Sequence, residues 1–226
     1  MSPAEPRPRP LLLGHRGARR YAPENSLEAF DLALQHGCDG FEFDVRRTAD
    51  GHSVICHDTK LFGLVVARNE FAKLRECGKK RSCEVASLEQ VLERFAPRAF
   101  LDIELKVGGL EQATVEALRR FPPARGYFVS SFLPEVVEEV HARDASVAVG
   151  LICDQRKQLA RWRELPVSAL FLHRRLASER TVSELHEAGK QVFVWTVNAA
   201  REMRVFEAMR VEGIISDDTE ELAQVF

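Results

Sequence analysis

The chain contains 226 residues, of which 45% are hydrophobic and 29% are charged, as is typical of a folded globular protein. Its 32 Lys and Arg residues nearly balance its 34 Asp and Glu residues, so no global positive field indicates a nucleic-acid partner. No apolar run approaches the roughly 18 residues that a membrane span requires. We therefore expect one globular domain, without nucleic acid and without a membrane span.

The first ten residues are rich in proline and carry two arginines, and we expect residues 1–10 to form a flexible tail before a domain at 11–226. Only three leucines follow, which is too short an apolar stretch for a secretion signal. The five cysteines are odd in number and none has CxxC spacing, which indicates reduced thiols and favours a cytoplasmic location.

Strand-like and helix-like segments alternate along the first half of the chain. Ser87 and Gln90 have the spacing of a capping box, which predicts the start of a helix. Asp50 and Gly51 predict a turn that leads into a short extra strand. We expect strands at 11–15, 40–48, 53–56, 100–106 and 127–131, and helices at 26–36, 87–94, 110–120 and 134–143.

The same alternation continues to the C-terminus, where Asn198 is expected to cap one of the helices. The expected strands are 147–152, 169–173, 191–197 and 211–216, and the expected helices are 155–162, 178–188, 199–209 and 220–226. Eight strand-helix units of this length predict an α/β fold, a single-domain (β/α)8 TIM barrel. The segment 59–86 shows no strand-helix unit, and we interpret it as a short insertion after the second strand that caps the site.

Acidic side chains lie where two neighbouring strands are expected to end. Alternate residues of a strand share one face, so Glu42 and Asp44 point together, and Glu104 shares a face with Lys106. Three converging carboxylates repel one another unless a cation lies between them, and oxygen ligands suit Mg²⁺, Ca²⁺ or Mn²⁺. The alternative is a buried ion-pair network of the same carboxylates with Lys106 and Arg16.

Two histidines, His15 and His57, follow strands at the same end of the barrel. Because imidazole titrates near neutrality, one can give a proton while the other accepts one. With Arg16 and Lys106 nearby, the cluster suits an anion, and a phosphoryl group is the obvious choice.

Several motifs resemble those of the glycerophosphodiester phosphodiesterase family, in the same order and from the first expected strand to the last. They are Gly14-His15-Arg16-Gly17, Ala22-Pro23-Glu24-Asn25-Ser26, Gly40-Phe41-Glu42-Phe43-Asp44-Val45, His57-Asp58, Ile103-Glu104-Leu105-Lys106, Trp195-Thr196-Val197-Asn198 and Gly213-Ile214-Ile215-Ser216-Asp217. The chain departs from the family after His57-Asp58, where the following segment is short and lacks the arginine and threonine of the leucine, arginine and threonine pattern with which the family's insertion opens. Glu24 and Asn25 are expected to order the loop after the first strand.

The resemblance implies hydrolysis of a small-molecule glycerophosphodiester to sn-glycerol 3-phosphate and an alcohol, with one divalent cation, Mg²⁺ or Ca²⁺, as cofactor and Mn²⁺ as a third choice. It assigns catalysis to His15 and His57, metal binding to Glu42, Asp44 and Glu104, phosphate binding to Arg16 and Lys106, and an aromatic pocket wall to Trp195. The alternatives are an inactive barrel that serves as a binding module and a related lipase that acts on lysolipids. The alcohol, the oligomeric state and the division of labour between the histidines stay open.

Overall fold

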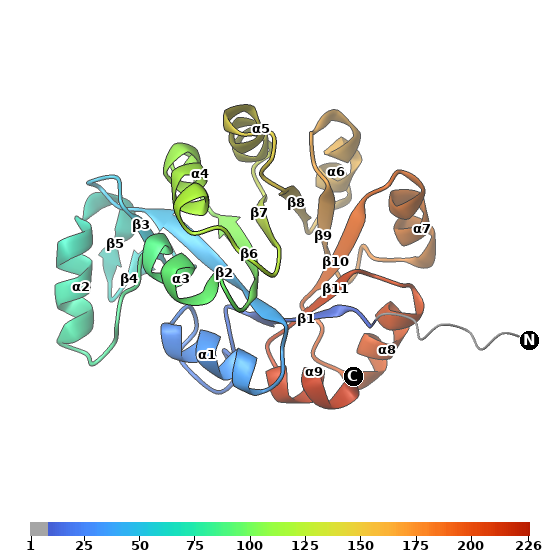
Figure 1. The fold of residues 1–226 in the computed structure, drawn as a ribbon, viewed down its shortest axis with the longest axis horizontal. Helices are drawn as coiled ribbons and strands as arrows, with labels where there is room; N and C mark the ends of the chain where they lie inside the picture. Colours follow the sequence, from blue (N-terminus) through green and yellow to red (C-terminus); the bar gives the residue numbers. More distant parts are fainter. Residues whose placement is uncertain (1–8) are drawn as a thin grey trace, which may run out of the picture.

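The computed structural model describes residues 9–226 and shows a closed barrel of parallel strands surrounded by helices (Figure 1). Strand β1 (Leu11–His15) pairs with both β2 (Gly40–Arg47) and β11 (Gly213–Ser216), which closes the ring. The other barrel strands are β6 (Phe100–Leu105), β7 (Tyr127–Ser131), β8 (Val149–Cys153), β9 (Ala169–His173) and β10 (Gln191–Trp195). The TIM barrel expected from the sequence is confirmed.

Two helices on the outside of the barrel begin at serine caps. Ser26 caps α1 by accepting a hydrogen bond from Ala29 N, and the capping box of Ser87 and Gln90 is present at α3. The helices after the barrel strands are α1 (Leu27–Gln35), α3 (Leu88–Phe95), α4 (Glu111–Arg120), α5 (Pro134–Arg143), α6 (Arg156–Leu159), α7 (Glu179–Glu187), α8 (Ala200–Ala208) and α9 (Thr219–Val225). Within residues 9–226, none of the helices is both long enough and apolar enough to cross a bilayer.

Two expectations for the helices are wrong. The helix expected at 155–162 breaks after α6 into the 3₁₀ segment η2 (Ala160–Glu164), because α6 buries no side chain and η2 buries only Trp162. Asn198 does not cap α8, whose preceding residue Ala199 makes no side-chain cap. The Asn198 side chain instead bonds to Asp217, so tertiary contacts outcompete the local cap.

The insertion, in which the sequence shows no strand-helix unit, contains a two-stranded hairpin and a helix. It follows β3 (Ser53–Ile55) and comprises β4 (Lys60–Leu61), β5 (Leu64–Val65), η1 (Val66–Arg68) and α2 (Phe71–Lys79). The hairpin turns through Phe62 and Gly63, whose φ angles are 54° and 83°. Phenylalanine is not typical of this left-handed conformation, so the sequence does not predict the turn. Leu74 is the one large apolar side chain that α2 buries, so the sequence of this helix shows little of the apolar periodicity that would predict it. Figure 1 shows these elements beside the barrel, beyond β3.

At the N-terminus, residues 1–8 of the expected flexible tail lie outside the described residues. Arg9, which lies within the expected tail, forms an ion pair through its guanidinium with Asp39 at 2.6 Å. Asp39 also accepts a hydrogen bond from the backbone N–H of Leu12 at 2.8 Å. These contacts attach the chain just before β1 to the turn that precedes β2.

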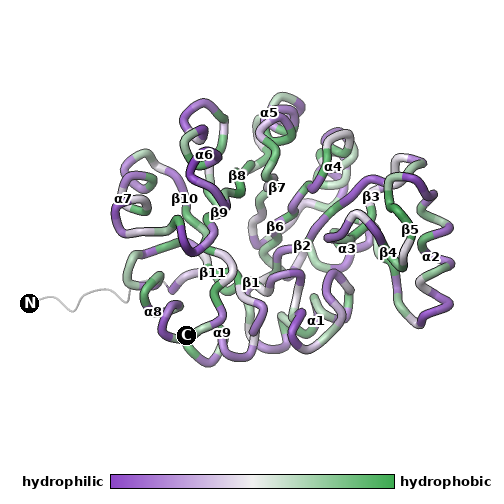
Figure 2. The backbone as a smooth tube through the Cα atoms, turned by 180° about the vertical axis from the view of Figure 1, so that it is seen from behind, coloured by the Kyte–Doolittle hydropathy of each residue, from purple (hydrophilic) through white to green (hydrophobic). Residues whose placement is uncertain are grey.

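The barrel is filled below its functional end by aromatic rings. Four phenylalanine rings form this floor, those of Phe100, Phe128, Phe171 and Phe193. Neighbouring rings have centroids between 4.8 and 6.1 Å apart. A Cβ on Gly150 would lie 2.4 Å from Phe171, and one on Gly213 would lie 2.3 Å from Phe193, so only glycine leaves room for the rings. Figure 2 shows the apolar strands inside and polar segments outside. The lumen cluster consists of Leu13, Phe100, Phe128, Ile152, Ala169, Phe171, Phe193 and Ile215.

Removing one of these rings is expected to leave a cavity that the barrel cannot close. We predict that Phe193→Ala lowers the free energy of unfolding by about 3–5 kcal/mol. Val205→Ala, at an exposed position of α8, is the control and should change it by about 0.5 kcal/mol or less. Denaturant titration measures both, and equal effects would show that the rings do not support the barrel.

Candidate active site

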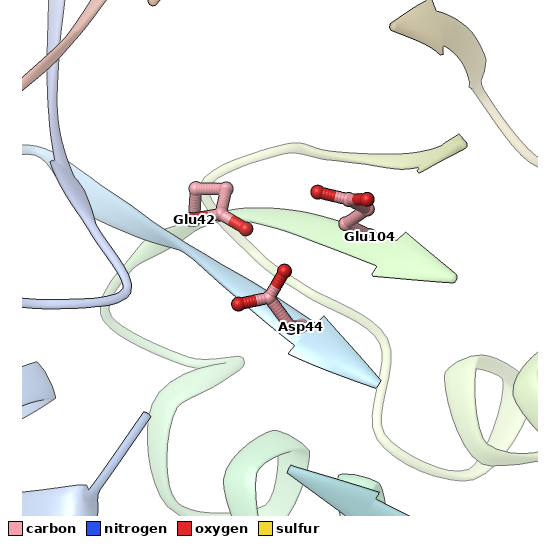
Figure 3. Close-up of side chains that lie close together, drawn as sticks. All are labelled: Glu42, Asp44 and Glu104. Carbon is pink, nitrogen blue, oxygen red and sulfur yellow. The ribbon is translucent and has the colours of Figure 1, made fainter. Parts of the chain in front are cut away.

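Three buried carboxylates face one another at the C-terminal ends of two neighbouring strands. Glu42 and Asp44 come from β2, and Glu104 comes from β6, where it is in register with Asp44. One oxygen from each lies within 4.8 Å of the other two, and Figure 3 shows all three groups turned toward a common point. An oxygen-only set of this kind suits a hard divalent cation.

Two cations reach the same carboxylates, as the ion-pair alternative requires. Lys106 Nζ lies 2.6 Å from Glu104 Oε1 and 3.3 Å from Asp44 Oδ1, and Arg16 Nε lies 3.3 Å from Asp44 Oδ2. Two positive charges do not balance three negative ones, however. Within the described chain, the buried Glu104 Oε1 accepts no hydrogen bond of good geometry. The carboxylates therefore fit a divalent cation in addition to the two side-chain cations.

The surroundings of these carboxyl groups shift their pKa values in opposite directions. Loss of solvent, with Asp44 and Glu104 nearby, raises the pKa of Glu42 well above its usual value. Burial also raises the pKa of Glu104 to about 7, despite Lys106. For Asp44, burial is outweighed by Lys106 and by a hydrogen bond from Asn25, so its pKa is lowered. The surroundings of the two glutamates therefore disfavour their charged forms, whereas those of Asp44 favour its charged form.

The turn after β1 brings main-chain and side-chain donors to the carboxylates. Arg16 adopts a left-handed backbone, φ 55°, and its N–H donates to Glu42 Oε2 at 2.9 Å. Gly17 follows at φ 78°, where a Cβ would lie 2.7 Å from the backbone of Ala29 on α1. The strained turn is therefore held against α1 while it aims Arg16 into the site.

The loop after this turn supports Asp44 from behind. Asn25 Nδ2 donates to Asp44 Oδ2 at 2.8 Å, and Asn25 Oδ1 accepts from Asp44 N at 3.1 Å. Glu24 forms ion pairs with Arg16 and with Arg19, each at 2.8 Å. Both residues order the loop, as expected, and Asn25 also fixes the orientation of a candidate metal ligand.

The two histidines face the site from different elements and have different partners. His15 Nδ1 lies 2.6 Å from Asp217 Oδ1, and its Nε2 lies 3.9 Å from Glu42 Oε2. Burial lowers the pKa of His15 and outweighs the opposing effect of Asp217. His57 Nδ1 lies 2.8 Å from Asp58 Oδ1. In the neutral form, a proton on Nδ1 of His15 leaves the lone pair of Nε2 free.

Sequence reasoning gave no role to two acidic residues of the site. Asp217 follows β11 and is held by Asn198 at 2.9 Å, a position that its place after a strand could have indicated. Asp102 shares its face of β6 with Glu104 and accepts from Ser130 Oγ at 2.6 Å. Burial raises the pKa of Asp102 well above its usual value, and its carboxyl group extends the polar lining of the cavity.

A cavity of about 130 Å³ opens among these groups, with a polar side and an apolar side. On the apolar side, Trp195 Nε1 donates to Phe171 O at 3.0 Å, which fixes the indole beside Phe132. The lining residues are His15, Arg16, Glu42, His57, Asp102, Glu104, Lys106, Phe132, Ile152, Phe171, Trp195 and Ile215. Seven of the eight site residues expected from the sequence line this cavity. The eighth, Asp44, lies beside them, in contact with Lys106 and Arg16.

The raised pKa values predict that metal binding releases protons. A carboxyl group whose pKa is raised on folding stabilises the metal-free protein below its unfolded value, 4.5, and loses that effect as the pH rises through about 7. We expect the metal-free protein to lose up to about 3 kcal/mol over this window. Metal affinity should rise over the same window.

Calorimetry in buffers of different ionisation enthalpy measures the released protons, and thermal unfolding follows the stability. Glu104→Gln is the control, because it removes the carboxyl group with the pKa of about 7. Metal affinity independent of pH in the unaltered protein would contradict this reading of the site.

Comparison with known proteins places the chain among related enzymes. The family model for the glycerophosphoryl diester phosphodiesterase family matches residues 15–221. A glycerophosphodiester phosphodiesterase of Caldanaerobacter subterraneus is 29% identical over 94% of this chain and 96% of its own length. A crystal structure of a glycerophosphodiester phosphodiesterase from Thermotoga maritima has a TM-score of 0.84 at 24% identity and covers 98% of this chain and 100% of its own.

A second similar structure was solved as a complex with a bound molecule. The phosphodiesterase of Oleispira antarctica in complex with the product sn-glycerol-3-phosphate has a TM-score of 0.85 at 24% identity. The similarity covers 96% of each of the two chains. At this identity it establishes the shared fold.

Proposed function

This chain belongs to the glycerophosphoryl diester phosphodiesterase family, and from that premise we propose that it hydrolyses glycerophosphodiesters to sn-glycerol 3-phosphate and an alcohol. The observation that carries the proposal is the convergence of three buried carboxylates, two cations and two histidines on one cavity. None of these positions is lost, which argues against an inactive barrel that serves as a binding module.

The charge of the cavity suits a phosphodiester. Glu42, Asp44 and Glu104 would hold the divalent cation, which supplies electrostatic stabilisation of a non-bridging phosphate oxygen when bound. With Arg16 and Lys106 beside it, the loaded site carries one net positive charge, and the single negative charge of a diester neutralises it. The cavity therefore favours a diester over a neutral molecule of the same size.

We assign the base to His15 and the acid to His57. The Asp217 carboxylate holds a proton on Nδ1 of His15, so Nε2 can take the proton of the attacking hydroxyl, whether of water or of the glycerol moiety. His57, paired with Asp58, donates a proton to the departing alkoxide. The P–O bond to the alcohol breaks as the bond to the attacking oxygen forms. Attack by water gives glycerol 3-phosphate directly, whereas attack by the glycerol hydroxyl gives a cyclic phosphate, which water must then open to yield glycerol 3-phosphate.

Release of glycerol 3-phosphate from a panel of diesters, with and without EDTA, tests the proposed function directly. We expect activity to disappear in EDTA and to return with Mg²⁺ or Ca²⁺. Glu104→Gln should lose most activity while its unfolding transition stays cooperative. Full activity after dialysis against EDTA would show that the carboxylates serve the fold alone.

The two histidines should differ in their response to the leaving group. His15→Ala and His57→Ala are each expected to lower kcat by about 10²–10⁴ with an alkyl diester. An aryl diester needs no acid because its leaving group has a low pKa, so it should restore turnover in His57→Ala alone. Rescue of His15→Ala instead would reverse the assignment.

Asp217 is expected to act through His15. Asp217→Asn replaces an acceptor by an amide that can place the proton on Nε2, and we predict at least a roughly tenfold loss of kcat with little change in KM. Because Asp217 raises the pKa of His15, the acidic limb of the pH-rate profile should move to lower pH. An unchanged limb would indicate a purely structural role. Asn198→Ala removes a side chain that holds Asp217 but leaves the carboxylate in place. Its kcat should lie between that of the unaltered protein and that of Asp217→Asn.

A further inference from the structure

A groove lies between α6–η2 and α7 on the outside of the barrel. Its volume is about 570 Å³, and it lies where the outer layer consists of the four-residue α6 and the 3₁₀ segment η2. Leu159 and Leu176, both half-buried, contribute apolar surface to its walls. Arg156, at the start of α6, also lines the groove, as do Arg175 and Arg180, which lie after β9 and in the first turn of α7.

This region is strongly basic in a chain whose net charge is −2. Residues 155–180 contain seven Lys and Arg residues against two Glu residues. Three of the arginines pair with carboxylates, namely Arg161 with Glu164, Arg163 with Glu184 and Arg174 with Glu202. Among residues 9–226, no carboxylate lies within 4.0 Å of the charged groups of Arg156, Lys157, Arg175 and Arg180.

The basic region adjoins the mouth of the catalytic cavity. Arg174 and Arg175 directly follow His173, the last residue of β9. The ring of His173 packs edge-on against Trp195 at a centroid distance of 5.2 Å, and Trp195 lines the cavity. A surface that binds this region would therefore lie close to the opening through which substrate enters.

We propose that this groove and its basic rim dock the protein on a membrane surface rich in anionic phospholipids. Guanidinium groups match the geometry of lipid phosphates, and the negative surface potential of such a membrane attracts unpaired cations. Leu159 and Leu176 add apolar contact between headgroups. Nucleic acid is disfavoured, because Trp162 is buried and Arg163 lies 4.4 Å above its ring, so it offers no open face for base stacking.

Docking there gives the enzyme access to its substrate where that substrate is made. A glycerophosphodiester is a phospholipid without its acyl chains, so a deacylation reaction must supply it at a lipid surface. This part of the inference rests on the proposed function, whereas the lipid binding itself does not. The experiment must therefore separate binding from catalysis.

Co-sedimentation with phosphatidylcholine vesicles, with and without phosphatidylglycerol, measures the docking. The full chain should sediment only with the anionic vesicles and should be released by added salt. The variant Arg156→Gln/Arg175→Gln/Arg180→Gln should bind about a hundredfold more weakly. The matched control, Arg68→Gln/Arg75→Gln/Arg125→Gln, removes three exposed arginines outside the groove and should bind like the unaltered protein.

Catalysis is followed in parallel on a soluble diester, which both triple variants should hydrolyse normally. Glu104→Gln should still bind vesicles, so a failure of the proposed function is distinguishable from a failure of docking. The proposal is overturned if the unaltered protein stays in the supernatant, or if the control variant loses as much binding as the groove variant. Binding of a single-stranded oligonucleotide through the same arginines, without vesicle binding, would also overturn it.

Discussion

Three carboxylates buried side by side are the constraint to which the rest of the site responds. Solvent cannot screen Glu42, Asp44 and Glu104 there, so every charge within reach matters for their stability. Lys106 and Arg16 offset part of this negative charge, and the surroundings also raise the pKa values of Glu42 and Glu104, which disfavours their charged forms. The same arrangement that makes three neighbouring carboxylates costly on their own suits a divalent cation between them.

Most of the supporting contacts come from segments far apart in the chain. The turn at Arg16 supplies a main-chain donor to Glu42, and Asn25 supplies two bonds to Asp44. Asp217, near the C-terminus, fixes the ring of His15, near the N-terminus, because closure of the barrel places β11 beside β1. Closure of the barrel therefore assembles the catalytic groups as well as the core.

The sequence predicted the barrel because alternating strands and helices are a repeated pattern, and it predicted the carboxylates because Glu42 and Asp44 alternate on one strand. Asp217 received no role, since its importance depends on a contact across 202 positions of the chain. The breaking of α6 also escaped prediction, because it reflects how few of its side chains find a place against the barrel. Local sequence patterns predicted the structure correctly where local interactions determine it. They were less reliable where tertiary contacts compete with those interactions.

The phenylalanine rings below the carboxylates limit how substrate and product can exchange. Because these buried rings fill the lumen, the cavity is closed by side chains on that side. Under the proposed function, diester and products would have to exchange at the opposite side, where the barrel strands end. A product that stayed bound against the carboxylates would then keep the next diester out, and the rate of turnover would depend on how readily that product leaves.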